Sequence, residues 1–317
     1  MREIVTVTGT IKPEEVGFCQ FHEHLLVSMG KSYEINPAIY MDDILKSAAE
    51  AALFKKAGGS TLIDAQPGGC NRMAEGLSEI SRRTGVSIIC ATGFHKMMFY
   101  PEGHWIFSSG EDALTDFFVR ELQVGVSNHC DFGLPQDIGG EKAGIIKCAL
   151  DHVNLTPQYE KLFRAAARAA LTTDRTMMVH IEKGSDPVGL LNYLLHLGMN
   201  PAHLVFCHMD RAVSDIGVHR TVLEAGVFLE FDTIGRFKYH SDEDEIALMR
   251  NLMDAGYEDQ LLFSLDTTRA RLKFYDPDAI GLDYILNTFT SKMRSAGISQ
   301  EQIDKISNRN CIRALAG

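Results

Sequence analysis

The chain has 317 residues, of which 45% are hydrophobic and 23% are charged, as in ordinary globular proteins. Its formal net charge is −11, and no run of lysines and arginines is long enough to follow a phosphate backbone, which argues against nucleic-acid binding. No apolar run reaches the length of a membrane span, no signal peptide is recognisable, and the seven cysteines lack close pairs, so we expect a cytoplasmic protein that does not bind membranes.

Eight short apolar runs are predicted to be β-strands. They are apolar throughout, as expected for strands whose two faces are both covered. In chain order the runs are residues 16–21, 60–65, 86–91, 144–149, 176–181, 204–207, 227–231 and 261–265.

Longer amphipathic segments between these runs are predicted to be helices. Thr156 and Pro157 are typical of an N-cap and a first helical residue, and Gly58 is typical of a helix end. The segments are residues 41–57, 157–172, 187–198, 242–255 and 282–296, with a last helix after Ser299. This alternation predicts an α/β fold, a (β/α)8 TIM barrel that forms a single domain over residues 1–317. A doubly wound open sheet is the alternative.

Six side chains at the later ends of these runs are candidate metal ligands. His22 and His24 end the first run and, two residues apart on an extended strand, point to the same face. The other four are Lys147, His180, His208 and Asp266. Because a barrel gathers its reacting groups at the C-terminal ends of its strands, the set predicts a site for zinc, manganese or cobalt ions.

Lys147 is the unusual member of this set, because an ammonium group repels a metal ion. Burial lowers the pKa of a lysine and frees its amine, which can then add carbon dioxide. The resulting carbamate is an anionic ligand with two oxygens that can bridge two ions. The alternative is a lysine that reaches solvent or pairs with an acid. Taken alone, His180 or His208 could equally be a hydrogen-bonded core histidine, and Asp266 could be a helix cap.

The longest irregular stretch, residues 94–110, follows the third predicted strand and is predicted to be an active-site loop. His95 begins this loop, and we expect it to line the pocket. Most of the remaining histidines lack a place at a strand end, and we expect them to be structural or exposed.

The ordered motifs resemble those of the phosphotriesterase family of the amidohydrolase superfamily. The matching pieces are His22-Glu23-His24, Ala91-Thr92-Gly93, Ala143-Gly144-Ile145-Ile146-Lys147, His180, His208 and Ser264-Leu265-Asp266. Residues 231–235 and 266–269 resemble the branch that contains phosphotriesterase homology proteins and sugar-phosphate lactonases. The chain departs from the family at Cys311, where the family often has proline, and at Leu272, where the lactonases have a tyrosine; Tyr275 lies nearby in sequence.

The resemblance implies a centre of two divalent metal ions, zinc in the first place and manganese or cobalt as alternatives. It assigns His22, His24 and Asp266 to the more buried ion, His180 and His208 to the more exposed ion, and carbamylated Lys147 to both. A hydroxide shared by the ions would attack the substrate, and Asp266 would accept or relay the proton.

The predicted function is that of a metal-dependent hydrolase that opens a lactone ring, preferably that of a phosphorylated sugar. Lys238 and Arg269 match the positions that receive the phosphate, while the alternative for both is a surface cation or an ion pair; Arg211, Arg236 and Arg271 are further candidates. Phosphotriesterase, acyl-homoserine lactonase and carboxylesterase activities are alternatives within the enzyme class, and a barrel that binds a ligand without turnover is the alternative outside it. We expect a small-molecule substrate, and family members are often dimers, so the resemblance also suggests a homodimer.

Overall fold

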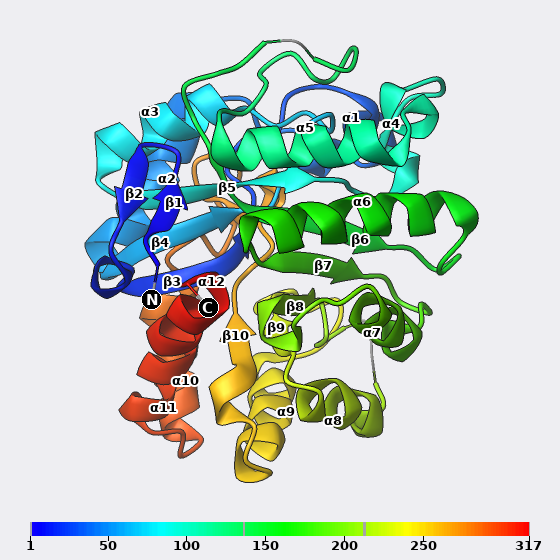
Figure 1. Ribbon diagram of the computed structural model, residues 1–317. Helices are drawn as coiled ribbons and strands as arrows, with labels where there is room; N and C mark the ends of the chain where they lie inside the picture. Colours follow the sequence, from blue (N-terminus) through cyan, green and yellow to red (C-terminus); the bar gives the residue numbers. More distant parts are fainter. Residues whose placement is uncertain (1, 136, 212–213, 317) are drawn as a thin grey trace.

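The computed structural model describes residues 2–135, 137–211 and 214–316. Eight parallel strands form one sheet in which each strand pairs with the next along the chain, and helices surround the sheet (Figure 1). The first and last strands meet at the seam, where the Asp266 N–H group donates to the His22 carbonyl over 3.0 Å. Beside them the rings of Phe18 and Phe263 lie 5.7 Å apart. The prediction of a (β/α)8 TIM barrel is confirmed.

Each strand of the barrel overlaps one of the predicted apolar runs. The strands are β3 (Phe18–Glu23), β4 (Gly59–Asp64), β5 (Ser87–Gly93), β6 (Ala143–Leu150), β7 (Met177–Ile181), β8 (Leu204–Cys207), β9 (Phe228–Phe231) and β10 (Leu261–Phe263). An antiparallel hairpin of β1 (Ile4–Thr6) and β2 (Gly9–Ile11) precedes them. This hairpin lies outside the predicted strands because each of its arms is too short to show an apolar pattern.

Most of the predicted helices are present, and others lie between them. The longer helices are α2 (Ile44–Ala57), α3 (Ala74–Thr84), α5 (Glu111–Gln123), α6 (Pro157–Thr173), α7 (Pro187–His196), α8 (Ile216–Glu224) and α9 (Asp242–Asp254). The shorter ones are α1 (Lys31–Ile35), α4 (Trp105–Ser108), α10 (Thr290–Ser295), α11 (Gln300–Asp304) and α12 (Asn310–Ala316). Of these, α1, α3, α4, α5 and α8 lie outside the predicted segments. None of the described helices is long and apolar enough to cross a membrane.

Local capping sets the helix ends. The Asp43 side chain accepts hydrogen bonds from the backbone N–H groups of Leu45 and Lys46, so α2 begins after the predicted start at residue 41. At α6 the Thr156 side chain accepts from the Tyr159 N–H group, as the Thr-Pro sequence predicts. The predicted helix 282–296 contains a π-helical turn, Ile285–Phe289, directly before α10.

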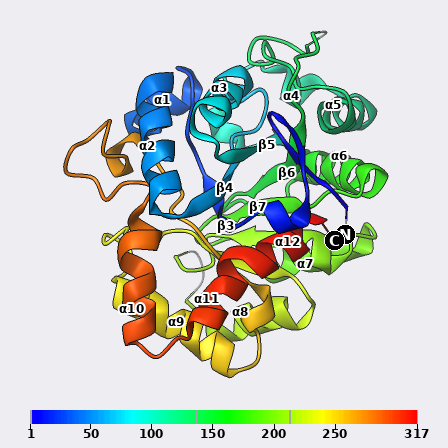
Figure 2. The ribbon, with the colours of Figure 1, turned by 90° about the vertical axis from the view of Figure 1, so that its left-hand side faces the viewer.

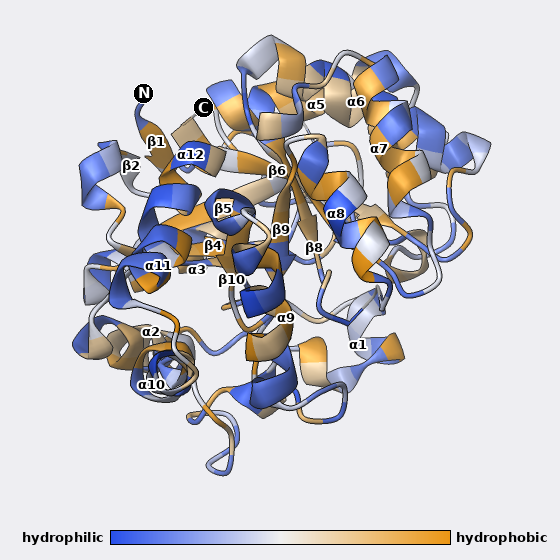
Figure 3. Cartoon of the chain, turned by 90° about the horizontal axis from the view of Figure 1, so that it is seen from below, coloured by the Kyte–Doolittle hydropathy of each residue, from blue (hydrophilic) through white to orange (hydrophobic). Residues whose placement is uncertain are grey.

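The apolar core has an inner and an outer layer. Side chains such as Phe21, Ile145 and Leu262 fill the inside of the barrel, and Leu315 of α12 packs against them at the N-terminal ends of the strands. The outer layer lies between the strands and the helices. Figure 3 shows the apolar strands at the centre and polar residues on the outward faces of the helices. Both chain ends lie together, where Arg2 donates to the Leu315 carbonyl over 3.2 Å (Figure 2).

A buried ion pair joins the loop before α3 to α5. Arg72 Nη2 lies 2.6 Å from Glu121 Oε1, and the two side chains are 1% and 0% exposed. Replacing Arg72 with leucine would leave the Glu121 charge buried without a partner. We therefore expect Arg72→Leu to lower the free energy of unfolding by about 3 to 5 kcal/mol, measured by urea denaturation.

The matched control is Arg83→Leu. Arg83 pairs with Glu79 on α3, but these side chains are 51% and 45% exposed, so water already screens the pair. Its loss should lower the free energy of unfolding by less than about 1 kcal/mol. Equal losses for the two variants would contradict the importance of the buried pair.

Candidate metal centre

A cavity of about 280 Å³ opens at the C-terminal ends of the barrel strands. Five of the six predicted metal ligands line it, namely His22, His24, His180, His208 and Asp266. The sixth, Lys147, is fully buried within the site, and its Nζ lies 3.0 Å from Nε2 of His22. The structure therefore brings all six side chains together, while their binding of metal stays a prediction.

The backbone explains why these side chains converge. Lys147 lies two residues after Ile145 on β6, and His180 lies two residues after Met178 on β7. Residues two apart on a strand share a face, so both side chains point into the barrel as their apolar neighbours do. His208 and Asp266 follow their strands with φ angles of 63° and 49°. This left-handed backbone conformation is uncommon for residues other than glycine and is often found at functional sites.

Apart from Lys147, the predicted ligands form two neighbouring groups. Nε2 atoms of His22 and His24 lie 3.7 Å and 3.5 Å from Asp266 Oδ1. In the second group Nδ1 of His180 lies 2.7 Å from Nε2 of His208. The two groups meet where the ring centroids of His22 and His208 lie 4.9 Å apart. One possible ion position therefore lies among His22, His24 and Asp266, and a second, adjacent position lies beside His180 and His208.

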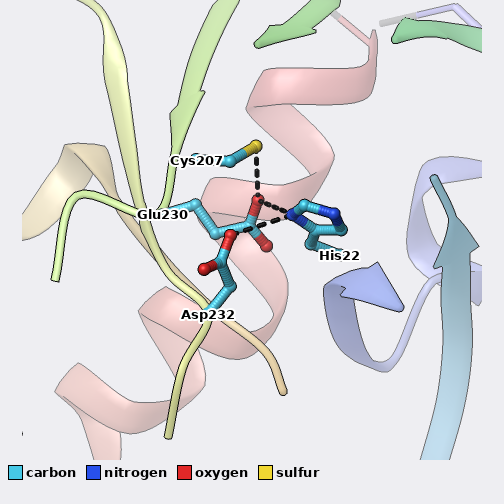
Figure 4. Close-up of side chains that lie close together, drawn as sticks. All are labelled: His22, Cys207, Glu230 and Asp232. Carbon is cyan, nitrogen blue, oxygen red and sulfur yellow. Dashed lines mark hydrogen bonds and ion pairs between the residues drawn. The ribbon is translucent and has the colours of Figure 1, made fainter. Parts of the chain in front are cut away.

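Asp232, directly after β9, orients two of the histidines. Its Oδ2 lies 2.9 Å from Nδ1 of His22, and its Oδ1 lies 2.5 Å from Nδ1 of His208 (Figure 4 shows the first of these contacts). The His208 backbone N–H group also donates to Asp232 over 3.0 Å. A carboxylate on Nδ1 fixes the tautomer in which Nε2 carries the free lone pair, and this arrangement is typical of metal-binding histidines.

Cys207 and Glu230 lie behind His22, on the side of Asp232 (Figure 4). The Cys207 thiol donates to Glu230 Oε2 over 3.1 Å, and Ser264 donates to Glu230 Oε1 over 2.7 Å. Burial raises the pKa of the Cys207 thiol well above its usual range, so the thiolate form that binds metals is disfavoured. Glu230 Oε2 lies 3.8 Å from Nδ1 of His22, which already contacts Asp232, so these groups support the ring of His22 on its Nδ1 side.

The charges of the centre suit divalent cations. Burial lowers the pKa of His24 to about 3 and that of His180 to about 4, so both rings are neutral near pH 7 and keep a lone pair for a metal. Burial alone would raise the pKa of Asp266, but Arg236 and the nearby histidines outweigh it and hold that pKa well below its usual range. In the described parts of the chain, Lys147 has no ion pair with a carboxylate. A buried ammonium in that position is costly, whereas a carbamate between two cations would be compensated.

Three cationic side chains line the same cavity. Lys96 pairs with Glu182 over 2.5 Å, and Arg236 Nη2 lies 3.0 Å from Asp266 Oδ2. Arg211 lines the cavity as well and, within residues 2–135, 137–211 and 214–316, forms no ion pair. It is therefore the cation that is most available to an anionic substrate.

The three predicted substrate contacts have different places. His95 lines the cavity, and its ring centroid lies 5.8 Å from that of His180. Lys238 is exposed and lies over the ring of Tyr239, outside the cavity lining. Arg269 also lies outside the lining and faces the Tyr275 ring, 5.9 Å from its centroid. Their contacts with substrate stay predictions.

Asp232 is the residue of the site that has no predicted role. A signal for it does exist in the sequence, because Asp232 directly follows an apolar run, as His208 does after β8. The rule that finds ligands at strand ends would therefore also have found this carboxylate. Of the further candidates for the phosphate that the sequence offers, Arg211 and Arg236 line the cavity and Arg271 does not, because all three lie in loops whose conformation the strand pattern does not determine.

Comparisons with known proteins agree with this geometry. The sequence model of the phosphotriesterase family matches residues 2–315. A phospho-furanose lactonase of Mycoplasmopsis synoviae (strain 53) is 27% identical over 320 residues, which cover 98% of this chain and 91% of that protein. The crystal structure of a lactonase from Listeria monocytogenes has a TM-score of 0.90 and 28% identity, with 99% of each chain covered. The phosphotriesterase homology protein of Escherichia coli, solved with phosphate in its active site, has a TM-score of 0.84 and 25% identity, covering 96% of this chain and 99% of that one.

Proposed function

The chain belongs to the phosphotriesterase family, and from that premise we propose that it is a binuclear metal-dependent enzyme that opens a phosphorylated sugar lactone. The resemblance predicted from the motifs is confirmed, and the chain is an ester-hydrolysing enzyme that acts on small molecules, as are its lactonase relatives. The observation that carries the finer proposal is the meeting of six separate side chains at the strand ends, with Asp232 aiming two of them.

The donor set fits two ions. We assign His22, His24 and Asp266 to one ion, His180 and His208 to the other, and Lys147, as a carbamate, to both. When bound, two such ions lower the pKa of a shared water molecule and polarise the substrate carbonyl. Imidazole-rich ligands favour zinc, and manganese or cobalt are alternatives.

We propose that Asp266 takes up the proton of the attacking water. Arg236 holds its Oδ2 at 3.0 Å, which keeps the carboxylate ionised and oriented toward the histidines. Glu23 fixes the backbone on both sides of Asp266, because it accepts hydrogen bonds from the N–H groups of Leu265 (2.8 Å) and Thr267 (3.2 Å). A positioned carboxylate of this kind can accept a proton without moving its main chain.

Arg211 supports a substrate that carries phosphate. It is a cavity-lining guanidinium in a protein of net charge −11, so it supplies the local positive charge that the whole molecule lacks. A guanidinium can donate two parallel hydrogen bonds to a phosphate. The Escherichia coli relative holds phosphate in its active site, which is consistent with such a pocket.

The test uses one sugar lactone with and without its phosphate, on protein reconstituted with metal and bicarbonate. We expect kcat/KM to be roughly 10 to 100 times higher for the phosphorylated form, because each charge-assisted hydrogen bond contributes about 1.5 to 3 kcal/mol. Arg211→Met should remove most of this preference by raising KM. A phosphotriester, an acyl-homoserine lactone and a simple carboxylic ester complete the panel, since the same centre could attack phosphorus or other carbonyl carbons.

The matched control is Lys238→Met, which removes an exposed cation that, like Arg211, lies over the ring of Tyr239. It should keep the preference for phosphate if Arg211 binds that group. Loss of the preference in Lys238→Met, but not in Arg211→Met, would place the phosphate at the position that the motifs predict instead. Equal kcat/KM for both lactones in the wild type would refute phosphate recognition, and no lactone hydrolysis by metal-loaded protein would refute the proposed activity.

A further inference from the structure

A second cluster of candidate metal ligands lies beside the centre. It consists of Asp210 after β8, His240 in the loop between β9 and α9, and Glu245 on α9. Each residue offers one ligand atom, and these atoms all lie within 4.8 Å of one another. We propose that the cluster binds one divalent cation, separate from the two ions proposed above. The inference goes beyond the proposed function, because it requires no particular substrate or reaction.

The distances fit ligands around one small ion. His240 Nε2 lies 2.9 Å from Glu245 Oε2 and 3.8 Å from Asp210 Oδ2. Zinc-ligand bonds of about 2.0 to 2.2 Å place tetrahedral ligand atoms roughly 3.3 to 3.6 Å apart, which lies between these two values. Small side-chain shifts are therefore enough to seat an ion.

The ring of His240 has the orientation expected of a metal ligand. Its Nδ1 lies 3.2 Å from the Ser241 carbonyl, to which Nδ1–H can donate, and its Nε2 faces the carboxylates and the Thr233 hydroxyl (2.9 Å), so a cation would take the place of the proton on Nε2. Hydrogen bonds also orient Asp210, because the backbone N–H and the hydroxyl group of Thr233 donate to its Oδ2 over 2.6 Å and 2.7 Å. These contacts leave Oδ1 of Asp210 for another partner.

The carboxylates are buried and incompletely satisfied. The side chains of Asp210 and Glu245 are each 0% exposed. Neither oxygen of Glu245 has a hydrogen bond of good geometry in the described structure, and neither does Oδ1 of Asp210. Buried polar atoms normally have partners, and buried charges are paired or bind metals. In the described parts of the chain no arginine or lysine forms an ion pair with either carboxylate, so a protonated His240 would be their single cationic partner.

A cation in this cluster would connect α9 to the two loops that follow β8 and β9. The β9 loop also carries Arg236 and Tyr239, which line the cavity. The ion would thus hold the wall of the cavity in place without contacting the substrate.

Metal content tests the site. After reconstitution with zinc and removal of loosely bound metal, we expect three zinc ions per wild-type chain and two per Glu245→Gln chain. Glu243→Gln is the matched control, because Glu243 lies on the same helix turn but is 73% exposed and pairs with Lys292; it should keep three ions. Equal zinc content in wild type and Glu245→Gln would overturn the proposal.

Anomalous diffraction at the zinc edge reads the wild-type site directly, even if the Glu245→Gln variant does not fold. A peak between His240 Nε2 and the two carboxylates would support the site. Peaks at His22 and His208 with none at His240 would overturn it. A peak at His240 with none at His22 and His208 would refute the binuclear centre and leave this inference standing, so the two failures are distinguishable.

Discussion

Replacing Lys147 with methionine is expected to lower kcat/KM for a lactone by about ten-thousandfold and to remove bound metal at the same time. Lys147 lies fully buried, with its Nζ 3.0 Å from Nε2 of His22, the histidine whose ring lies 4.9 Å from that of His208. Methionine has a similar size, so packing is largely kept, but it cannot form a carbamate. Loss of the shared ligand removes several kcal/mol of electrostatic stabilisation from the transition state, and each 1.36 kcal/mol is a factor of ten. Steady-state kinetics and metal analysis of the same samples measure both effects.

Two controls separate the role of Lys147 from general damage. Lys161→Met removes a lysine of α6 that lies outside the cavity lining and whose Nζ donates to the carbonyls of Phe107 and Ser109, so it should keep activity and metal. Wild-type apoprotein should regain activity faster with bicarbonate than without it, whereas Lys147→Met should not respond. Full activity and full metal content in Lys147→Met would contradict the proposed bridge.

Asp232→Asn is expected to weaken metal binding and to lower kcat/KM by about a thousandfold. The Asp232 carboxylate accepts a hydrogen bond from Nδ1–H of His22 and another from Nδ1–H of His208. An asparagine can accept at one ring but presents an NH2 group to the other, which then takes the tautomer with its proton on Nε2. That proton blocks the lone pair a metal ion needs. The loss of one such supporting contact typically costs 10- to 100-fold, and the neutral amide also weakens the contact that remains to the other histidine, so the combined cost is about a thousandfold.

Competition with a chelator measures the metal affinity of this variant. Glu230→Gln is the comparison, because Glu230 lies 3.8 Å from Nδ1 of His22, farther than Asp232 does. A glutamine at this position can still accept the hydrogen bond from Ser264. It should cost less than about tenfold. Unchanged metal affinity in Asp232→Asn would show that the tautomers of His22 and His208 are set in some other way.

The barrel and the convergence of the six side chains could be predicted because both follow from strand geometry. Parallel strands covered on both faces read as apolar runs, and the alternation of side chains fixes that Lys147 and His180 point inward. The last residue of a run then lies at the mouth of the barrel. The same reasoning extends to Asp232, although its role emerges only from the two short contacts to the histidine rings.

The lining of the cavity could not be predicted in this way, because it depends on loops. Lys238 and Arg211 both follow strand ends closely in sequence, yet Lys238 is exposed while Arg211 lines the cavity. The conformation of these loops depends on contacts between different loops. One example is the pair of hydrogen bonds from Thr233 to Asp210, two residues that are 23 positions apart. No periodic pattern in the sequence encodes such contacts.

The meeting of the two chain ends has a practical consequence. Arg2 and Leu315 touch at the face where α12 packs against the start of the barrel strands, whereas the candidate centre opens at the opposite face. A solid support, an affinity handle or a fused partner attached at either end would therefore leave the entrance for substrate unobstructed. A short linker between the ends would also permit circular permutation, with new ends in an exposed helix connection, while the six converging side chains stay on their strands.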